Sequence, residues 1–315
     1  MTARPQVLAD VYGKRLAELA AEDPRIVAID ADVSRRMGTY GGIGAAFPDR
    51  HINVGIAEQN MIGVAAGLAT VGKIPFAGTY AVFLTGRAWD QVRQALSYPK
   101  LSVKLVGLHS GISVGEDGAT HQATEDIALM RALPGVTVLS PCDALETAQA
   151  VDLARDIQGP VYIRLFRPPA PPLMPDGYRL ELGKAPLMRE GSDVTIAACG
   201  RMVALALAAA ASLAQEGVSA RVLNMVSIKP IDRDAIIAAA RETGGLVSVE
   251  DHTVIGGLGS AVAEVLAEAG VGKLRRLGVQ DCFAESGDCE SLYEMYGLST
   301  AHIAAAAREL AGRGR

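Results

Sequence analysis

The sequence is poor in aromatic residues, in cysteine and in clustered charge. Phe, Trp and Tyr make up 4% of its 315 residues, and 30 basic residues stand against 35 acidic ones for a net charge of −5. There is no run of Lys or Arg, which excludes a nucleic acid or an anionic membrane as the main partner. Small molecules and other proteins remain as candidate partners.

The cysteines number four and do not form a recognisable site. They are Cys142, Cys199, Cys282 and Cys289. Their spacing matches neither a CxxC pair nor a zinc site, and a chain of this size needs no disulfide to stabilise it. We therefore expect all four to be reduced and structural, with Cys282 and Cys289 close enough in sequence to merit a redox test.

No apolar run is long enough to cross a membrane. The longest, 202–214, is shorter than the roughly 18 residues that a span requires. The first residues show no apolar core followed by a small-residue cleavage site, so no secretory signal is predicted. We expect a cytoplasmic protein that does not bind membranes.

The dominant pattern is an alternation of short β-branched runs with Ala- and Leu-rich helical segments. This alternation is typical of βαβ units and a parallel sheet. At roughly 100 to 200 residues per domain the length suggests two domains, although length alone also permits one α/β barrel. The expected strands are 26–30, 103–108, 136–139 and 161–165, then 194–198, 220–224 and 245–249.

A proline-rich stretch separates the two groups of strands. The run RPPAPPLMPDG, 167–177, contains five prolines in eleven positions. No helix or central strand accommodates that many, because proline lacks an N–H and has a fixed φ. We predict a first domain over 1–166, a linker over 167–190 and a second domain over 191–315.

Polar residues that follow the predicted strands are the candidates for chemistry. In open α/β sheets ligands bind at the carboxyl ends of strands. Glu58 is the most informative, because it begins a predicted helix, 58–70, that is otherwise small and apolar. Its carboxylate either complements the helix dipole or shares a proton with a ligand. The local pattern leaves both open.

The scarce aromatics gather in one segment. Phe76, Tyr80, Phe83 and Trp89 all lie in PFAGTYAVFLTGRAWDQ. Core packing explains most aromatic residues. Tyr80 and Phe83 fall in a predicted strand-to-helix turn, where a flat ligand stacked on them is the alternative.

Three segments together resemble the transketolase family of thiamine-diphosphate enzymes. They are GIAEQNMIGVAAGLA, FAGTYAVFLTGRAWDQV and HSGISVGEDGATHQATEDIALMRALPG, in this order. GEDGATHQ is the most specific, whereas FLTGRAWDQV is closer to the 1-deoxyxylulose-5-phosphate synthases. The resemblance covers essentially the whole chain. It implies an α/β protein of two doubly wound domains, a pyrimidine-binding thiamine-diphosphate fold followed by a transketolase C-terminal-like domain.

The resemblance implies cofactor-binding roles for four residues. Glu58 matches the acid that hydrogen-bonds the aminopyrimidine ring of the cofactor and favours its imino tautomer. Phe83 matches the aromatic residue that stacks on this ring, and Tyr80 a second aromatic of the pocket. Asp32 matches an acid that lines the pocket, although it could instead cap the next segment. Gly86 stands where many transketolases have a further aromatic.

Substrate residues follow from the same resemblance. His109, Asp117 and His121 match side chains that contact the sugar hydroxyls and carbonyl oxygen, where proton donors and acceptors must alternate. With Glu58, the two histidines are the implied catalytic residues. HSG replaces the common HDS, so the neighbours of His109 differ. Arg167 matches the arginine for the substrate phosphate, and Arg164 is a less certain partner.

One element of the family is missing from the sequence. A GDG motif followed by Asn, which in the family holds Mg²⁺ and the diphosphate, does not occur. We therefore assign no metal ligand to this chain. A second polypeptide is expected to carry the diphosphate domain with Mg²⁺ or another divalent ion, in an α₂β₂-like assembly.

The resemblance implies one component of a heteromeric transketolase. Such an enzyme moves a two-carbon ketol unit from a ketose phosphate to an aldose. A split 1-deoxyxylulose-5-phosphate synthase or a 2-oxo acid decarboxylating component is the enzymatic alternative. A scaffold subunit without catalytic function is the third hypothesis.

Overall fold

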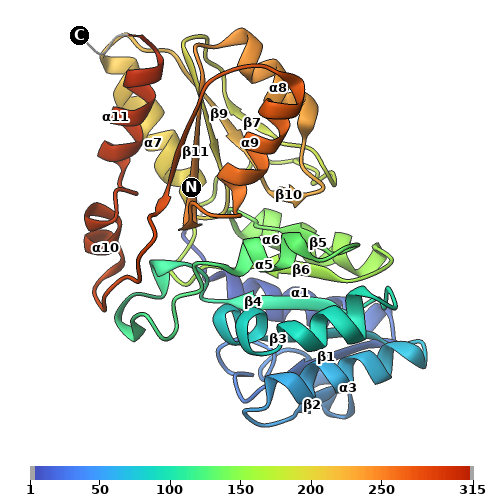
Figure 1. Cartoon of the computed structure of the whole chain (residues 1–315). Coiled ribbons are helices and arrows are strands. Elements are labelled where there is room, and N and C mark those ends of the chain that lie inside the picture. Colours follow the sequence, from blue (N-terminus) through green and yellow to red (C-terminus); the bar gives the residue numbers. More distant parts are fainter. Residues whose placement is uncertain (1–3, 313–315) are drawn as a thin grey trace. The chain divides into compact units, whose positions relative to one another are not determined.

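The chain folds into two compact units. The computed structural model describes residues 4–312 (Figure 1). The N-terminal unit comprises the chain up to Ser110 together with Leu129–Leu180, and the C-terminal unit comprises Gly111–Ala128 together with the chain from Glu181 onward. The short segment Gly111–Ala128, from the first half of the sequence, thus folds with the second half.

A parallel sheet forms the centre of the N-terminal unit. Within this unit its strands follow the order β5-β6-β4-β3-β1-β2, and all neighbours are parallel. Most of its positions are buried, as expected for a sheet covered on both faces. The strands are β1 (Ile26–Asp30), β2 (His51–Asn53), β3 (Ile74–Tyr80), β4 (Lys104–Leu108), β5 (Thr137–Leu139) and β6 (Val161–Arg164).

Amphipathic helices cover this sheet. α1 packs against α6, and α1 buries Leu8, Tyr12, Leu16 and Leu19, which recur at the spacing of one helix face. The α-helices are α1 (Leu8–Glu22), α2 (Ile43–Ala46), α3 (Glu58–Thr70), α4 (Trp89–Gln91), α5 (Asp126–Ala132) and α6 (Ala144–Asp156). Shorter turns of this unit are η1 (Pro48–Arg50), η2 (Phe83–Arg87) and η3 (Val92–Ser97), of which η2 and η3 are π-helical. The turn η4 (Ile112–Asp117) belongs to the C-terminal unit.

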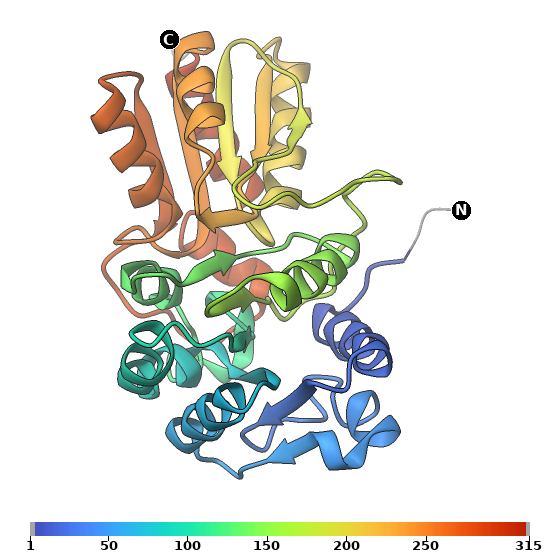
Figure 2. The same ribbon diagram turned by 90° about the vertical axis from the view of Figure 1, so that its right-hand side faces the viewer.

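The C-terminal unit has a second sheet, with the strand order β12-β11-β8-β9-β7 and an antiparallel β7. α7 packs against α11 and α8 against α9, and every residue of β8 is buried, so both faces are covered (Figure 2). Its strands are β7 (Leu187–Arg189), β8 (Val194–Ala198), β9 (Ala220–Asn224), β11 (Leu246–Thr253) and β12 (Leu274–Val279). The short strand β10 (Ser227–Lys229) of this unit lies outside the sheet. The helices are α7 (Met202–Gln215), α8 (Arg233–Glu242), α9 (Leu258–Ala269), α10 (Cys289–Met295) and α11 (Thr300–Leu310). The predicted fold class, two doubly wound α/β domains, is confirmed.

The proline-rich stretch lies between β6 and β7. Within this described part of the chain it forms no helix and no extended strand. Its backbone is nevertheless held. Asp143 caps α6, because its Oδ1 accepts from Glu146 N at 2.9 Å. The Oδ2 of the same carboxylate accepts from the N–H groups of Leu173 and Met174, each at 2.8 Å. One buried carboxylate therefore ties the stretch to the start of a helix.

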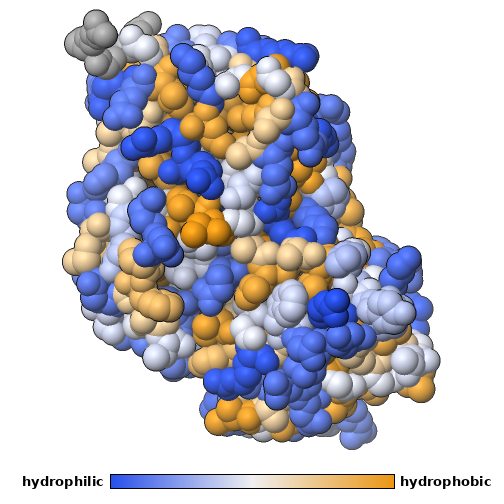
Figure 3. Space-filling view, in the orientation of Figure 1, coloured by the Kyte–Doolittle hydropathy of each residue, from blue (hydrophilic) through white to orange (hydrophobic). Residues whose placement is uncertain are grey.

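The surface and the helices give no sign of a membrane span. On the face drawn in Figure 3, apolar patches are broken up by polar residues. None of the helices within residues 4–312 combines the length and apolar character needed to cross a bilayer. All four cysteines are free, with Cys142 and Cys199 buried.

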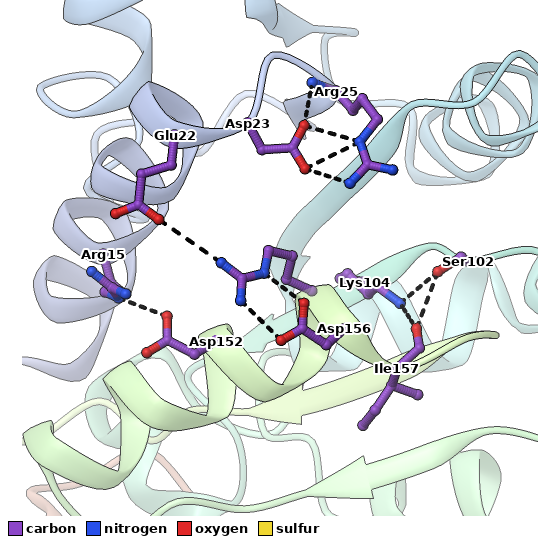
Figure 4. A network of polar contacts seen from close by, with 10 residues as sticks. Arg15, Glu22, Asp23, Arg25, Ser102, Lys104, Asp152, Asp156 and Ile157 are labelled. Carbon is purple, nitrogen blue, oxygen red and sulfur yellow. Dashed lines mark hydrogen bonds and ion pairs between the residues drawn. The ribbon is translucent and has the colours of Figure 1, made fainter.

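A buried lysine lies at the start of β4 (Figure 4). Lys104 Nζ donates to Ser102 Oγ at 2.7 Å, to the Ile157 carbonyl at 2.6 Å and to the Gly159 carbonyl at 3.1 Å. The Ile157 and Gly159 carbonyls follow the last turn of α6. The same helix forms an ion pair with α1, in which Arg15 Nε lies 2.7 Å from Asp152 Oδ1. Burial lowers the pKa of Lys104 to about 8.

The lysine predicts a rise of stability with pH. Between the folded pKa of about 8 and the unfolded value of 10.5, the unfolded chain binds the proton and the folded chain does not. The contribution of Lys104 to the free energy of unfolding therefore increases with pH in this range. In urea unfolding, the free energy of unfolding of the wild type should rise relative to that of Lys104→Met between about pH 8 and pH 10.5. The exposed Lys14→Met variant should show no such trend, and a constant difference for Lys104→Met would contradict the prediction.

Candidate active site

Glu58 is a buried acid at the first position of α3. It is 2% exposed, because the helix turns Met61, Ile62 and Ala65 into the core and packs on β3. The N-cap residue, Ala57, provides no side-chain cap. A buried carboxylate requires a hydrogen-bond donor, and Glu58 Oε2 accepts from Arg87 Nη1 at 3.0 Å.

Arg87 joins this acid to an aromatic ring. It closes the π-helical turn η2, and its guanidinium carbon lies 4.6 Å from the centroid of the Phe83 ring, over the ring. Its backbone carbonyl accepts from Gln59 Nε2 at 3.2 Å. Arg87 was not predicted as a site residue. The motif FLTGR, which contains both Phe83 and Arg87, was the one indication of it in the sequence.

Two further residues complete the group. Tyr80, the last residue of β3, has its ring 5.9 Å from that of Phe83 and 4.8 Å from that of His109, the latter edge-on. His109 directly follows β4 and adopts a positive φ of 54°. We call Glu58, Tyr80, Phe83, Arg87 and His109 the Glu58 site.

The aromatic segment divides into core and site. Phe76 is completely buried beside Tyr12, with ring centroids 6.5 Å apart, so it fills the core. Trp89 Nε1 donates to the Leu129 carbonyl at 3.0 Å. Tyr80 and Phe83 are only half-buried. A Cβ added to Gly86 would meet nothing within 4 Å, so this position has room for a side chain.

The Glu58 site has the chemistry to bind a flat, hydrogen-bond-donating group. The guanidinium of Arg87 is planar, donates to Glu58 and lies over the face of Phe83. A heterocycle with an N–H at its edge satisfies the same two partners, since stacking needs a flat face and the carboxylate needs a donor. The residues present therefore fit an aminopyrimidine ring.

Asp32 lies after β1 and outside these contacts. It is exposed, has a φ of 62°, and its Oδ1 accepts from Asn53 Nδ2 at 3.3 Å. Its neighbour Asp30 is completely buried, and Asp30 Oδ2 lies 2.6 Å from His51 Nε2. This acid–imidazole pair was not predicted, because the two residues are 21 positions apart.

The predicted substrate residues belong to different units. His109 and the half-buried Arg167 lie in the N-terminal unit, and Arg167 follows β6. Asp117 and His121 lie in the C-terminal unit, on the segment Gly111–Ala128, which we call the 111–128 loop. Asp117 is exposed, and His121 Nδ1 lies 3.0 Å from Thr120 Oγ1.

No group of three or more His, Cys, Asp or Glu side chains in residues 4–312 is arranged to hold a metal ion.

Two family models match the chain. The model of the transketolase pyrimidine binding domain matches residues 5–171, and that of the transketolase C-terminal domain matches residues 183–303. The chain belongs to the transketolase family. Both parts of the resemblance, the pyrimidine-binding domain and the C-terminal domain, are thereby confirmed.

Several similar proteins are subunits or sections of transketolases. The 6-deoxy-6-sulfo-D-fructose transketolase subunit SqwH of a Clostridium species is 46% identical over 97% of this chain and 95% of its own length. A putative transketolase C-terminal section of Methanocaldococcus jannaschii is 44% identical over 93% and 92%. A 1-deoxy-D-xylulose-5-phosphate synthase of Caldanaerobacter subterraneus is 40% identical over 94% of this chain but 47% of its own length.

Solved transketolase structures have the same fold as this chain. A split gene transketolase in an inactive β4 tetramer is 48% identical, with a TM-score of 0.91 over 98% of this chain and 100% of that one. The transketolase from Leishmania mexicana is 27% identical, with a TM-score of 0.83 over 99% and 47%. This chain therefore spans a whole split subunit but about half of an undivided transketolase.

The ion pair of Glu58 and Arg87 predicts a measurable coupling. Since Glu58 is buried and Arg87 is half-exposed, we expect a coupling free energy of about 1 kcal/mol. A double-mutant cycle of Glu58→Gln and Arg87→Met in urea unfolding measures it. The more exposed pair Arg233 and Glu268 should give a smaller value. Equal couplings for the two pairs would show that burial of Glu58 does not strengthen its bond.

Proposed function

We propose that this chain is one subunit of a two-component transketolase. In this proposal the enzyme moves a two-carbon ketol unit from a ketose phosphate to an aldose and is active only with a second chain. The observation that carries it is the Glu58 site, in which a buried acid and an aromatic face already hold a planar donor. The site lies in the part of the chain that matches the transketolase pyrimidine binding domain.

Each residue of the Glu58 site has a role in the proposal. Phe83 stacks on the pyrimidine ring and Tyr80 closes the pocket beside it. Glu58 accepts a hydrogen bond from a ring nitrogen and so holds a proton there. Thiamine diphosphate, when bound, supplies the nucleophilic carbon. Arg87 must leave the face of Phe83 to admit the ring, and its half-exposed side chain has room to do so. Asp32 is proposed to line the same pocket.

Substrate contacts are assigned to four residues. His109 and His121 donate and accept protons as the sugar carbonyl becomes an alkoxide and the carbon–carbon bond breaks. Asp117 binds a sugar hydroxyl. Arg167 binds the terminal anion, because a planar guanidinium matches phosphate with two hydrogen bonds. A sulfonate offers similar oxygens, and the relative from Clostridium is a transketolase subunit for 6-deoxy-6-sulfo-D-fructose.

A partner chain is part of the proposal. The sequence has no GDG motif to hold Mg²⁺ and the diphosphate, and similar chains are subunits or sections of split transketolases. The partner therefore supplies the metal and diphosphate site, in an α₂β₂-like assembly. We place this assembly in the cytoplasm.

A second enzymatic function has one specific observation in its favour. FLTGRAWDQV resembles the 1-deoxyxylulose-5-phosphate synthases, one of which is 40% identical to this chain. A split synthase or a related 2-oxo acid decarboxylating component would use pyruvate. Comparing pyruvate with ketose phosphates as donors separates this from the transketolase. A scaffold subunit would turn over neither donor.

The first prediction of the proposal concerns Glu58. The chain mixed with a GDG-containing protein encoded beside it should transfer a ketol unit when thiamine diphosphate is present. Glu58→Gln should lower kcat at least about 100-fold, as expected when a proton-transferring group is removed. Asp10→Asn, which changes an exposed acid in the first turn of α1, is the matched control. Full activity of Glu58→Ala would refute the assignment.

The second prediction concerns the substrate anion. Arg167→Ala should raise KM for a ketose phosphate about tenfold or more, since a charge-assisted hydrogen bond contributes about 1.5–3 kcal/mol. KM for an uncharged ketose should change little. Running fructose 6-phosphate beside 6-deoxy-6-sulfo-D-fructose shows which anion is preferred. An equal rise for charged and uncharged donors would contradict a role in anion binding.

A further inference from the structure

Asp251 lies in β11 with its side chain almost completely buried. It is 3% exposed. Its Oδ1 accepts from Ile112 N at 2.8 Å, and its Oδ2 accepts from Ser113 N at 3.3 Å. Both N–H groups belong to the start of the 111–128 loop, 139 and 138 positions away in sequence.

The start of the loop needs an external hydrogen-bond acceptor. Ile112 and Ser113 open the turn η4, whose first N–H groups have no partner within the turn. Its N-cap is Gly111, which has no side chain to cap them. Asp251 therefore caps the first N–H groups of η4 from a strand distant in sequence, a role that a local Asp or Ser has at most helix starts.

Gly111 permits this approach. Its φ is 71°, which favours glycine, and a Cβ at this position would overlap the carboxylate of Asp251. Tyr293, completely buried on α10, donates its hydroxyl to Asp251 Oδ2 at 2.8 Å. Burial and the nearby carboxylate raise the pKa of Tyr293 well above its usual value, so the hydroxyl remains a donor.

The remainder of the loop is held by the same unit. Thr253 N donates to the Thr124 carbonyl at 2.7 Å, and Ala128 N donates to His252 Nε2 at 3.3 Å. Gln122 Nε2 donates to the Glu285 carbonyl at 3.0 Å. The loop is thus fixed at its start by Asp251 and again after His121.

We propose that Asp251 is a positioning residue, whose carboxylate fixes the first turn of the 111–128 loop and thereby sets where Asp117 and His121 meet the substrate. The inference rests on the proposed function, because it assigns substrate contacts to those two residues. It gives Asp251, a residue of the C-terminal domain, an indirect part in substrate binding. Asp251 itself touches no substrate in this account.

Hydrogen–deuterium exchange of the free chain tests the attachment without any activity. In Asp251→Ala, peptides covering 111–123 should exchange at least about tenfold faster than in the wild type, since Ile112 N and Ser113 N lose their acceptor and the start of the loop is released. The matched control is Asp232→Ala, which also removes a buried acid that accepts two N–H groups, from Ala235 at 3.0 Å and Ala185 at 2.9 Å. Unchanged exchange in Asp251→Ala, or equal acceleration in both variants, would overturn the proposal.

Kinetics of the assembled enzyme test the consequence. Asp251→Asn keeps the shape of the side chain and should raise KM for the ketose donor about fivefold or more, with a smaller loss of kcat. Tyr293→Phe should act in the same direction, and Asp232→Ala should leave KM unchanged. A released loop with an unaltered KM would overturn the positioning role. If the assembled wild type has no transketolase activity, the proposed function fails, and the exchange experiment still decides whether Asp251 fixes the loop.

Discussion

A carboxylate removed from water must be matched by hydrogen-bond donors, and three of the buried acids in this chain illustrate that requirement. Asp143 ties the proline-rich stretch to the start of α6. Asp251 ties the 111–128 loop to β11. Glu58 holds Arg87 over an aromatic ring. In each case the acid holds a segment by hydrogen bonds, and in the proposed function two of these segments, the 111–128 loop and the turn η2, carry site residues.

The donors distinguish a structural acid from one that is available to a ligand. Asp143 and Asp251 accept from backbone N–H groups, which cannot leave without unfolding the local turn. Glu58 accepts from the end of a long side chain that is half-exposed. A ligand with a planar N–H edge can replace that guanidinium and restore the hydrogen bond, so the burial of Glu58 does not prevent its use. In the proposed function the same acid holds Arg87 in the free chain and binds the cofactor in the assembled enzyme.

Local patterns predicted much of the fold and part of the site. Hydrophobic periodicity predicted most of the strands of both sheets and the start of α3 at Glu58, because these depend on neighbours in sequence. β12 was not predicted, since this edge strand exposes Arg275 and Arg276 and lacks an apolar run. The bond of Arg87 to Glu58 spans 29 positions, and that of Ile112 to Asp251 spans 139. No local pattern contains such contacts, so the attachment of the 111–128 loop to the C-terminal unit emerged only from the structure.

In the proposed function this chain holds the pyrimidine half of thiamine diphosphate, and a second chain holds the diphosphate half. Calorimetric titration of the cofactor with Mg²⁺ into this chain, into the GDG-containing partner and into their mixture tests it most directly. The account predicts tight, saturable binding in the mixture only, and its loss when Glu58→Ala replaces the wild type. Binding to this chain alone with the affinity of the mixture would contradict the account.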